Sequence, residues 1–196
     1  MKTFRAFGPT IGKGKLSKNI IKKINNYVGN SVISKKNDYS SKLASQIKNE
    51  IKFNTSFIKK TLSKELIKNI KEYLKKSGVY KIREVKIINV WVVRQYKHEY
   101  NPIHYHEGQL SGVGYLEIPK NMNKNRLVGN KKIKTNGTID FINGQKNFLS
   151  KSIYNLNPKL GDLVIFPNYL MHTVYPFNID GERRSFSFNV KILFKK

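Results

Sequence analysis

The sequence has no cysteine, and this absence removes a whole group of chemistries. Without thiols the chain can form no disulfide, no thiolate metal site and no cysteine nucleophile. Any bound metal ion must therefore be held by histidine, aspartate or glutamate side chains. Because the chain has only 4 histidines, few imidazoles have to be considered as ligands.

Acidic residues are also scarce. The chain has 12 of them against 38 lysines and arginines, which gives a formal net charge of +26. A field of that sign attracts nucleic acid, acidic glycans or lipid headgroups. Most of the cations are lysines scattered over expected helix faces, where water would solvate them in any protein. A polyanion is therefore an expected alternative partner rather than the main one.

The chain lacks any apolar run long enough to span a bilayer, and its first residues lack the apolar core and cleavage site of a signal peptide. We therefore expect a soluble, cytoplasmic protein, which would act in the host cytoplasm if its source is viral. A length of 196 residues suits one sizeable core. We expect a single domain over 1–196, with a mainly helical part over 1–79 and the main core over 80–196.

Apolar residues at helical spacing predict helices in the first part. One helix follows Ser17, which can cap it, and ends at Gly29. Its inner face consists of Ile20, Ile21, Ile24 and Val28. Another stripe, which ends at the segment KKSG, consists of Leu62, Leu66, Ile70, Tyr73 and Leu74. Leu43, Ile47 and Ile51 also recur every fourth residue, which predicts a helix between these two.

From Tyr80 onward the spacing changes to alternation, and the content of β-branched and aromatic residues rises. Short strand candidates include YKIREVKIINVWVVRQY, SGVGYLEIP, GTIDFI, LVIF, HTVYPF and RSFSFNVKILF. Many short strands in one unit indicate a jelly roll. The predicted fold class is α+β, with N-terminal helices packed outside a jelly roll. The Lys- and Asn-rich segment 120–134 is interpreted as a lid or a solvated connector.

Two histidines precede one of these strands. In an extended segment the side chains of His104 and His106 lie on the same side, so both could bind one ion. A third ligand is needed, and His172 follows a Pro-containing turn after another strand. A single histidine beside a strand is more often structural than ligating. The pair alone therefore leaves both readings open.

The segment after His172 carries a second signal. In DGERRSFSFNVKI the residues Arg183 and Ser185 alternate with apolar neighbours. Such a strand is typical of a half-exposed sheet edge. In a barrel that also holds histidines it could bind a carboxylate, because arginine grips that group through a planar fork and serine adds a hydroxyl donor.

Taken together, the ordered motifs HYH, LSGVGYL, GTIDF, GDLVIFPNYLMHTVYPF and RRSFSFNV resemble the iron(II)- and 2-oxoglutarate-dependent oxygenases. The likeness covers roughly residues 80 to 194. It is strongest to a branch found in bacteria and phages that is distantly related to prolyl 4-hydroxylases. The resemblance implies a double-stranded β-helix fold, Fe(II) as cofactor and 2-oxoglutarate as cosubstrate.

Carried over residue by residue, the resemblance assigns two sites. The metal ligands are His104, His106 and His172. Arg183 and Ser185 match the residues that bind the far carboxylate of 2-oxoglutarate. Tyr115 matches a position where relatives often have a tyrosine that also reaches this carboxylate. Arg184 is the alternative to Arg183, but alternation places it on the face opposite Ser185.

One position departs from the family pattern. The usual site has two histidines and one carboxylate, and His106 stands where the carboxylate is expected. Glu107 is the nearest carboxylate, yet in an extended strand it faces away from His104 and His106, so only a bulge or a turn there would make it a ligand. The fourth histidine, His98, matches no family position and is interpreted as a loop residue.

The sequence therefore predicts an oxygenase, most simply a hydroxylase, with a small-molecule cosubstrate and an unknown primary substrate. One alternative is a three-histidine iron dioxygenase or cupin-like protein that does not use 2-oxoglutarate. Another is a non-catalytic basic jelly-roll module that binds nucleic acid or an anionic glycan.

Overall fold

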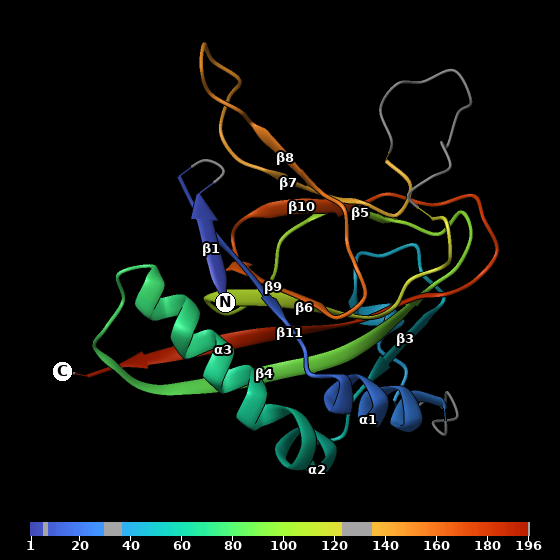
Figure 1. Cartoon of the computed structure of the whole chain (residues 1–196), viewed down its shortest axis with the longest axis horizontal. Coiled ribbons are helices and arrows are strands. Elements are labelled where there is room, and N and C mark those ends of the chain that lie inside the picture. The colour runs from blue at the N-terminus through green and yellow to red at the C-terminus, as the bar shows by residue number, and fades with distance from the viewer. Residues whose placement is uncertain (6–7, 30–36, 123–134, 196) are drawn as a thin grey trace.

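The structure is a computed structural model that describes residues 1–5, 8–29, 37–122 and 135–195. Most of the predicted connector, residues 123–134, lies outside the described part of the chain. Two antiparallel sheets face each other, and helices cover one side of the larger sheet (Figure 1). This is the predicted α+β jelly roll with helices outside.

The larger sheet contains strands from both ends of the chain. In spatial order its strands are β1 (Lys2–Arg5), β2 (Thr10–Lys15), β9 (Asp162–Pro167), β6 (Leu110–Glu117), β11 (Arg183–Phe194), β4 (Ile82–Gln95) and β3 (Asn49–Lys52). The smaller sheet consists of β5 (Asn101–His104), β10 (Met171–Val174), β7 (Ile139–Ile142) and β8 (Ile153–Leu156). Every described neighbouring pair is antiparallel.

Both well-marked helices form where the sequence predicts them. Helix α1 spans Lys18–Gly29, and its third residue, Ile20, donates its backbone N–H to the Ser17 hydroxyl over 3.3 Å, as expected for a capping serine. Helix α3 spans Ser63–Lys76 and follows α2 (Thr55–Phe57) and the π-helical turn η2 (Ile58–Leu62). None of the described helices is long and apolar enough to cross a membrane.

Two apolar layers hold the sheets and helices together. The outer layer lies between the helices and the larger sheet, where Ile24 and Ile70 pack with Phe186 and Phe188 of β11. The inner layer lies between the two sheets and includes Phe141 and Phe166. The alternating polar positions of β11 therefore face inward, toward the smaller sheet.

The motif LSGVGYL has a packing reason for its glycines. Gly112 and Gly114 on β6 lie opposite Phe188 and Phe186 on β11. A Cβ atom at either glycine would come within 2.3 Å of the opposing phenylalanine ring. The glycines let the two rings lie flat across the sheet, which keeps the outer layer closed.

The helix predicted from Leu43, Ile47 and Ile51 is wrong. The segment contains only a short 3-10 turn, η1 (Ser40–Lys42), followed by the edge strand β3. Ile47 and Ile51 are both buried, but they contact different parts of the core. Their four-residue spacing came from a loop followed by a strand, and not from one helix face. Residues 1–79 thus contribute β1, β2 and β3 to the larger sheet as well as the helices.

Candidate active site

Strand pairing brings two of the histidines together. His104 ends β5 and lies directly opposite His172 on β10. Their ring centroids are 4.2 Å apart. His106 follows two residues after His104, and its ring centroid lies 4.9 Å from that of His104 and 5.0 Å from that of His172. The structure therefore gathers all three histidines that the sequence singled out.

Backbone carbonyls orient two of these rings. The Nδ1 atom of His104 lies 2.7 Å from the Pro102 carbonyl oxygen, and that of His172 lies 2.9 Å from the Leu170 carbonyl oxygen. A carbonyl can only accept, so each Nδ1 carries the proton and donates it. The Nε2 atom of each ring is then unprotonated and available as a ligand.

His106 is positioned through its backbone and by an aromatic neighbour. Its N–H donates to the Asn168 carbonyl over 3.1 Å, and its own carbonyl accepts from the Asn168 side chain over 3.0 Å. Trp91 lies beside the imidazole, with ring centroids 5.7 Å apart. Asn168 follows β9, so the turn that leads to His172 also fixes His106. No sequence motif marks Asn168, and only this pairing identifies it.

The surroundings keep all three imidazoles neutral. Burial lowers the pKa of His104, and burial together with the neighbouring His104 lowers the pKa of His106 to about 3. Burial also lowers the pKa of His172 well below its usual value, and His104 and His106 add to the effect. Neutral rings need not release a proton when they bind a cation, which favours metal binding near neutral pH.

The cluster is suited to hold one metal ion. The ligand atoms of the three histidines all lie within 4.8 Å of one another, close to the span of two metal–nitrogen bonds, about 4 Å. Among the described residues no other group of histidines and carboxylates converges in this way. Glu107 is exposed and outside the cluster, and so is His98.

A cavity of about 300 Å³ connects the histidines with the inner face of the larger sheet. Arg183 lines it and is only 2% exposed. Its guanidinium donates to Gln95 Oε1 over 2.8 Å and to the Tyr115 hydroxyl over 3.3 Å, while its Nε has no partner among the described residues. Burial lowers the pKa of Arg183, but arginine stays charged in proteins. The cavity thus contains a buried cation that no described carboxylate neutralises.

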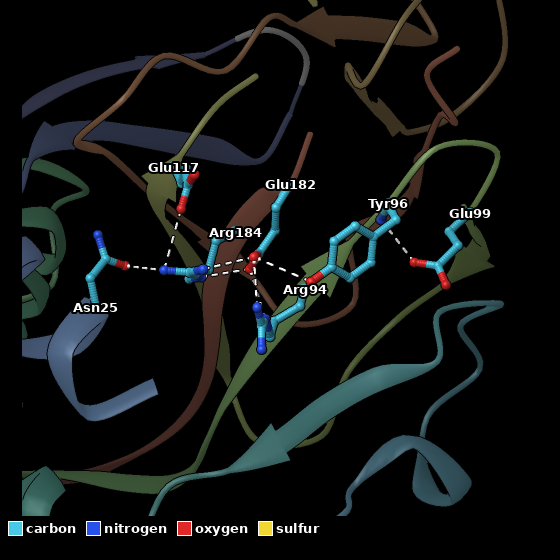
Figure 2. A network of polar contacts seen from close by, with 7 residues as sticks. All are labelled: Asn25, Arg94, Tyr96, Glu99, Glu117, Glu182 and Arg184. Carbon is cyan, nitrogen blue, oxygen red and sulfur yellow. Dashed lines mark hydrogen bonds and ion pairs between the residues drawn. The ribbon is translucent and has the colours of Figure 1, made fainter. Parts of the chain in front are cut away.

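The neighbouring arginine, Arg184, forms ion pairs outside the cavity. Figure 2 shows Arg184 paired with Glu182, and further bonds to Glu117 and Asn25. Arg94 makes a second two-point contact with Glu182. Burial alone would raise the pKa of Glu182, but these two arginines lower it to about 2. Arg184 is therefore neutralised on the helix-covered face, which leaves Arg183 as the arginine that faces the cavity.

One row of side chains crosses the sheet beside Arg183. Ser185 on β11 lies opposite Val93 on β4 and opposite Tyr115 on β6. Directly opposed residues share a face of the sheet, and all three line the cavity. The Tyr115 ring centroid also lies 5.0 Å from the Arg183 guanidinium carbon. The structure places Arg183, Ser185 and Tyr115 together at one end of the cavity.

Gln95 is a supporting residue that the sequence analysis did not single out. It is opposite Arg183 in the β4–β11 register, and it donates through Nε2 to the Glu99 carbonyl over 2.6 Å and the Tyr175 carbonyl over 3.2 Å. These two bonds turn its Oε1 toward Arg183. Only the strand register could have revealed this role, because a glutamine inside an apolar strand carries no signal by itself.

The edge strand β3 adds a second buried charged group to the cavity. Glu50 is 1% exposed, and its Oε2 accepts a hydrogen bond from the Ser45 hydroxyl. Burial raises the pKa of Glu50, the Ser45 hydroxyl lowers it, and Glu99 and Asp38 raise it, and the net result is a pKa of about 7. Glu50 was not among the predicted site residues, because its segment was expected to form a helix and not strand β3.

The raised pKa of Glu50 predicts a pH-dependent stability. The unfolded chain releases the Glu50 proton near pH 4.5, whereas the folded chain holds it up to about pH 7. The contribution of Glu50 to the free energy of unfolding therefore falls as the pH rises through this window. The free energy of unfolding of Glu50→Gln, measured relative to the wild type, should therefore increase by about 1–3 kcal/mol when the pH is raised from 5 to 8.

Urea unfolding of both proteins at pH 5, 6, 7 and 8 measures this difference. Glu84→Gln is the matched control, because it removes the same charge from an exposed carboxylate. A gain that is the same size at pH 5 and pH 8 would contradict the prediction.

Comparison with known proteins agrees with this geometry. Residues 89–189, just over half of the chain, match the model of a family described as "Putative 2OG-Fe(II) oxygenase". The chain belongs to this oxygenase family. The oxygenase accordingly uses iron(II) as cofactor and 2-oxoglutarate as cosubstrate. A search of curated proteins gave no match.

Solved structures share the fold of this oxygenase at low sequence identity. The viral collagen prolyl hydroxylase of Paramecium bursaria Chlorella virus-1, in complex with 2-oxoglutarate, has a TM-score of 0.60 and 17% identity over 92% of this chain and 94% of that one. A Pseudomonas putida prolyl-4-hydroxylase has a TM-score of 0.57 and 10% identity over 95% and 93% of the two chains. Iron-bound HygX from Streptomyces hygroscopicus has a TM-score of 0.58 and 11% identity over 95% and 82%.

Proposed function

We propose that this oxygenase holds iron(II) through His104, His106 and His172 and binds the far carboxylate of 2-oxoglutarate through Arg183. Ser185 and Tyr115 support the same carboxylate with their hydroxyl groups. When bound, iron and 2-oxoglutarate would supply the oxidising chemistry with dioxygen as the oxidant: one oxygen atom enters the succinate that forms from the cosubstrate with loss of carbon dioxide, and the other converts a C–H bond of the primary substrate into C–OH.

The observation that carries the proposal is the buried guanidinium of Arg183 in the same cavity as the histidines. A buried cation without a counterion is costly, so a fold that retains one needs an anion to occupy that place. A dicarboxylate fits, because one carboxylate can pair with Arg183 while the other end reaches the histidine cluster. A jelly-roll module that only binds a partner through its surface has no need of this arrangement.

The remaining residues of the site position these groups. The carbonyls of Pro102 and Leu170 fix the rings of His104 and His172. Gln95 holds the guanidinium from the sheet side. Because Tyr115 and Arg183 are both buried and line the cavity, the anion would bind away from bulk water, where a charge-assisted hydrogen bond is strongest.

Anaerobic titration tests the assignment. Adding 2-oxoglutarate to the iron(II)-loaded protein should produce a charge-transfer absorption band, and admitting oxygen should then convert 2-oxoglutarate into succinate. Protein prepared without iron is the control and should give neither signal. Absence of the band together with absence of succinate would refute the proposal.

The same experiment separates the nearest rival. A three-histidine iron dioxygenase that does not use 2-oxoglutarate would take up oxygen without releasing succinate. The three-histidine ligand set of His104, His106 and His172 is the feature on which this alternative is based. Succinate release in proportion to oxygen uptake would exclude it.

A polyanion partner, suggested by the net charge of +26, would have to bind elsewhere. Apart from Arg183, the described residues that line the cavity include one cation, Lys42, against two carboxylates, Glu50 and Glu107. Binding of duplex DNA with a steep salt dependence would therefore indicate a contact on the outer surface, independent of the oxygenase site.

A further inference from the structure

The cavity has a second polar end that the cosubstrate residues do not use. Glu50 lines it from β3, and its Oε1 has no hydrogen-bond partner among the described residues. No described cation forms an ion pair with Glu50. Glu50 is thus a buried carboxylate without a described cation, just as Arg183 is a buried cation without a described carboxylate. It could accept hydrogen bonds from a cationic group of a ligand.

Strand register separates the two ends of the cavity. Glu50 lies opposite Val93, and Val93 lies opposite Ser185, so the three share one row and one face of the sheet. Two strand spacings, about 10 Å, therefore separate the backbones of Glu50 and Ser185. A group bound to Glu50 would leave the place beside Arg183 free for 2-oxoglutarate.

Apolar and aromatic side chains connect Glu50 with the histidines. Trp91 lies beside His106 on one side and beside Tyr39 on the other, with ring centroids 5.7 Å apart in each case. Ile47, Leu43 and Val93 pack with these two rings. A carbon chain could lie along this wall with its oxidised carbon near the histidines and a charged end at Glu50. Aromatic rings also attract cations through their faces.

Charge favours a cation at this end. Glu107 lines the cavity, and together with burial it raises the pKa of Tyr39. Glu99 and Asp38 lie close enough to Glu50 to raise its pKa. Lys42 is the opposing charge at this end among the described lining residues, and it is exposed. Lys52 does not line the cavity, although its Nζ lies 5.4 Å from the Tyr39 ring centroid. The positive field of the whole protein is screened over about 8 Å at physiological salt, so the local charge depends on these nearby groups, of which Glu50 is the buried one.

We propose that Glu50 determines substrate specificity by binding an ammonium or guanidinium group of the primary substrate, with Trp91 and Tyr39 lining the path to the histidines. The inference rests on the proposed function, because it places the substrate relative to the iron and 2-oxoglutarate sites. Strand β3 precedes residues 89–189, which match the oxygenase family, so this carboxylate belongs to a part of the chain that the family match does not include.

Binding of matched probes to the anaerobic protein loaded with iron(II) and 2-oxoglutarate tests the proposal. At pH 8, calorimetry should show that n-pentylammonium binds about tenfold or more tightly than n-pentanol, since a charge-assisted hydrogen bond to a buried carboxylate is lost in the alcohol. In Glu50→Gln the ratio should fall to about one. Glu84→Gln, which removes an exposed charge, should keep the wild-type ratio.

A second pair of probes distinguishes two sources of the cation. A lysine tripeptide is compared with the same peptide carrying acetyl-lysine. A preference for the cation in the peptide pair alone indicates a polypeptide substrate, and a preference in the small-amine pair alone indicates a metabolite; both support the proposal. No preference in either wild-type pair, or an unchanged preference in Glu50→Gln, would overturn it.

The absorption band of the bound 2-oxoglutarate is recorded in each sample before the probe is added. If the wild type lacks this band, the proposed function fails. If the band is present and the cation preference is absent, only the assignment of Glu50 fails. Circular dichroism of Glu50→Gln verifies folding, and the predicted gain in stability at pH 8 makes loss of structure an unexpected outcome.

Discussion

Replacing Arg183 with methionine should remove the stabilisation of the iron-loaded protein by 2-oxoglutarate. In the wild type, 2-oxoglutarate at 100 times its Kd should add about 2.7 kcal/mol to the free energy of unfolding. Loss of one partner of a buried charge pair costs about 2–5 kcal/mol of binding. The Kd of Arg183→Met for 2-oxoglutarate should therefore rise at least about 30-fold, and succinate formation at low cosubstrate should fall with it.

The ligand-free form of Arg183→Met should behave differently. Methionine removes a buried charge that no described carboxylate neutralises, which favours the folded state. The change also leaves Gln95 Oε1 without its donor, which costs about 1–3 kcal/mol. These effects oppose each other, so the unfolding midpoint without ligand should change much less than the midpoint with 2-oxoglutarate.

Arg184→Met is the matched control on the opposite face of β11. It breaks the contacts with Glu182 and Glu117 in Figure 2, so it should lower stability without changing the affinity for 2-oxoglutarate. Differential scanning fluorimetry with and without 2-oxoglutarate measures both effects. If Arg183→Met binds 2-oxoglutarate as tightly as the wild type, the cosubstrate does not bind at this end of the cavity.

Local patterns in the sequence were sufficient for the parts of the fold that depend on local physics. Helices α1 and α3 have a capping serine or a continuous apolar stripe, and both form as predicted. The prediction for the short edge strand β3 was wrong for a physical reason. Its four residues pair with β4, which lies more than 30 residues further along the chain, and their neighbours happen to repeat apolar residues at helical spacing.

The residues of the candidate site also fall into those that the sequence could identify and those that it could not. His104, His106, His172, Arg183 and Ser185 could be found because their motifs occur in order and match a known family. Gln95, Asn168 and Glu50 could not, because their positions depend on strand register and on turns that bring distant segments together. A buried glutamate in an edge strand also contradicts the usual polarity of such positions, so no hydrophobic pattern would indicate it.

His106 occupies the position where the family pattern has a carboxylate, and the structure offers no replacement among the described residues. Glu107 is exposed, and Glu50 is outside the histidine cluster. Three neutral imidazoles would leave the full charge of +2 on a bound iron(II) ion, which favours binding of a dianionic cosubstrate. An aspartate at this position would reduce the net charge of the site to +1.

Substitutions of His106 should separate metal binding from cosubstrate binding. His106→Ala removes one of three ligands and should lower iron(II) affinity at least about 100-fold, because even outer contacts of metal ligands are worth 10–100-fold. His106→Asp restores an oxygen ligand, so it should recover most of the metal binding. Its lower site charge should raise the Kd for 2-oxoglutarate about three- to tenfold relative to the wild type, by roughly 1 kcal/mol.

Iron content after dialysis against a weak chelator and anaerobic titration with 2-oxoglutarate measure the two properties separately. His98→Asn is the control, because His98 is exposed, outside the cluster and has a φ of 67° that asparagine tolerates. It should retain wild-type values for both. If His106→Ala kept its iron, His106 would not be a ligand. If His106→Asp bound iron no better than His106→Ala, the backbone that Asn168 holds would accept only the longer imidazole, and the third histidine would be a geometric requirement of this site.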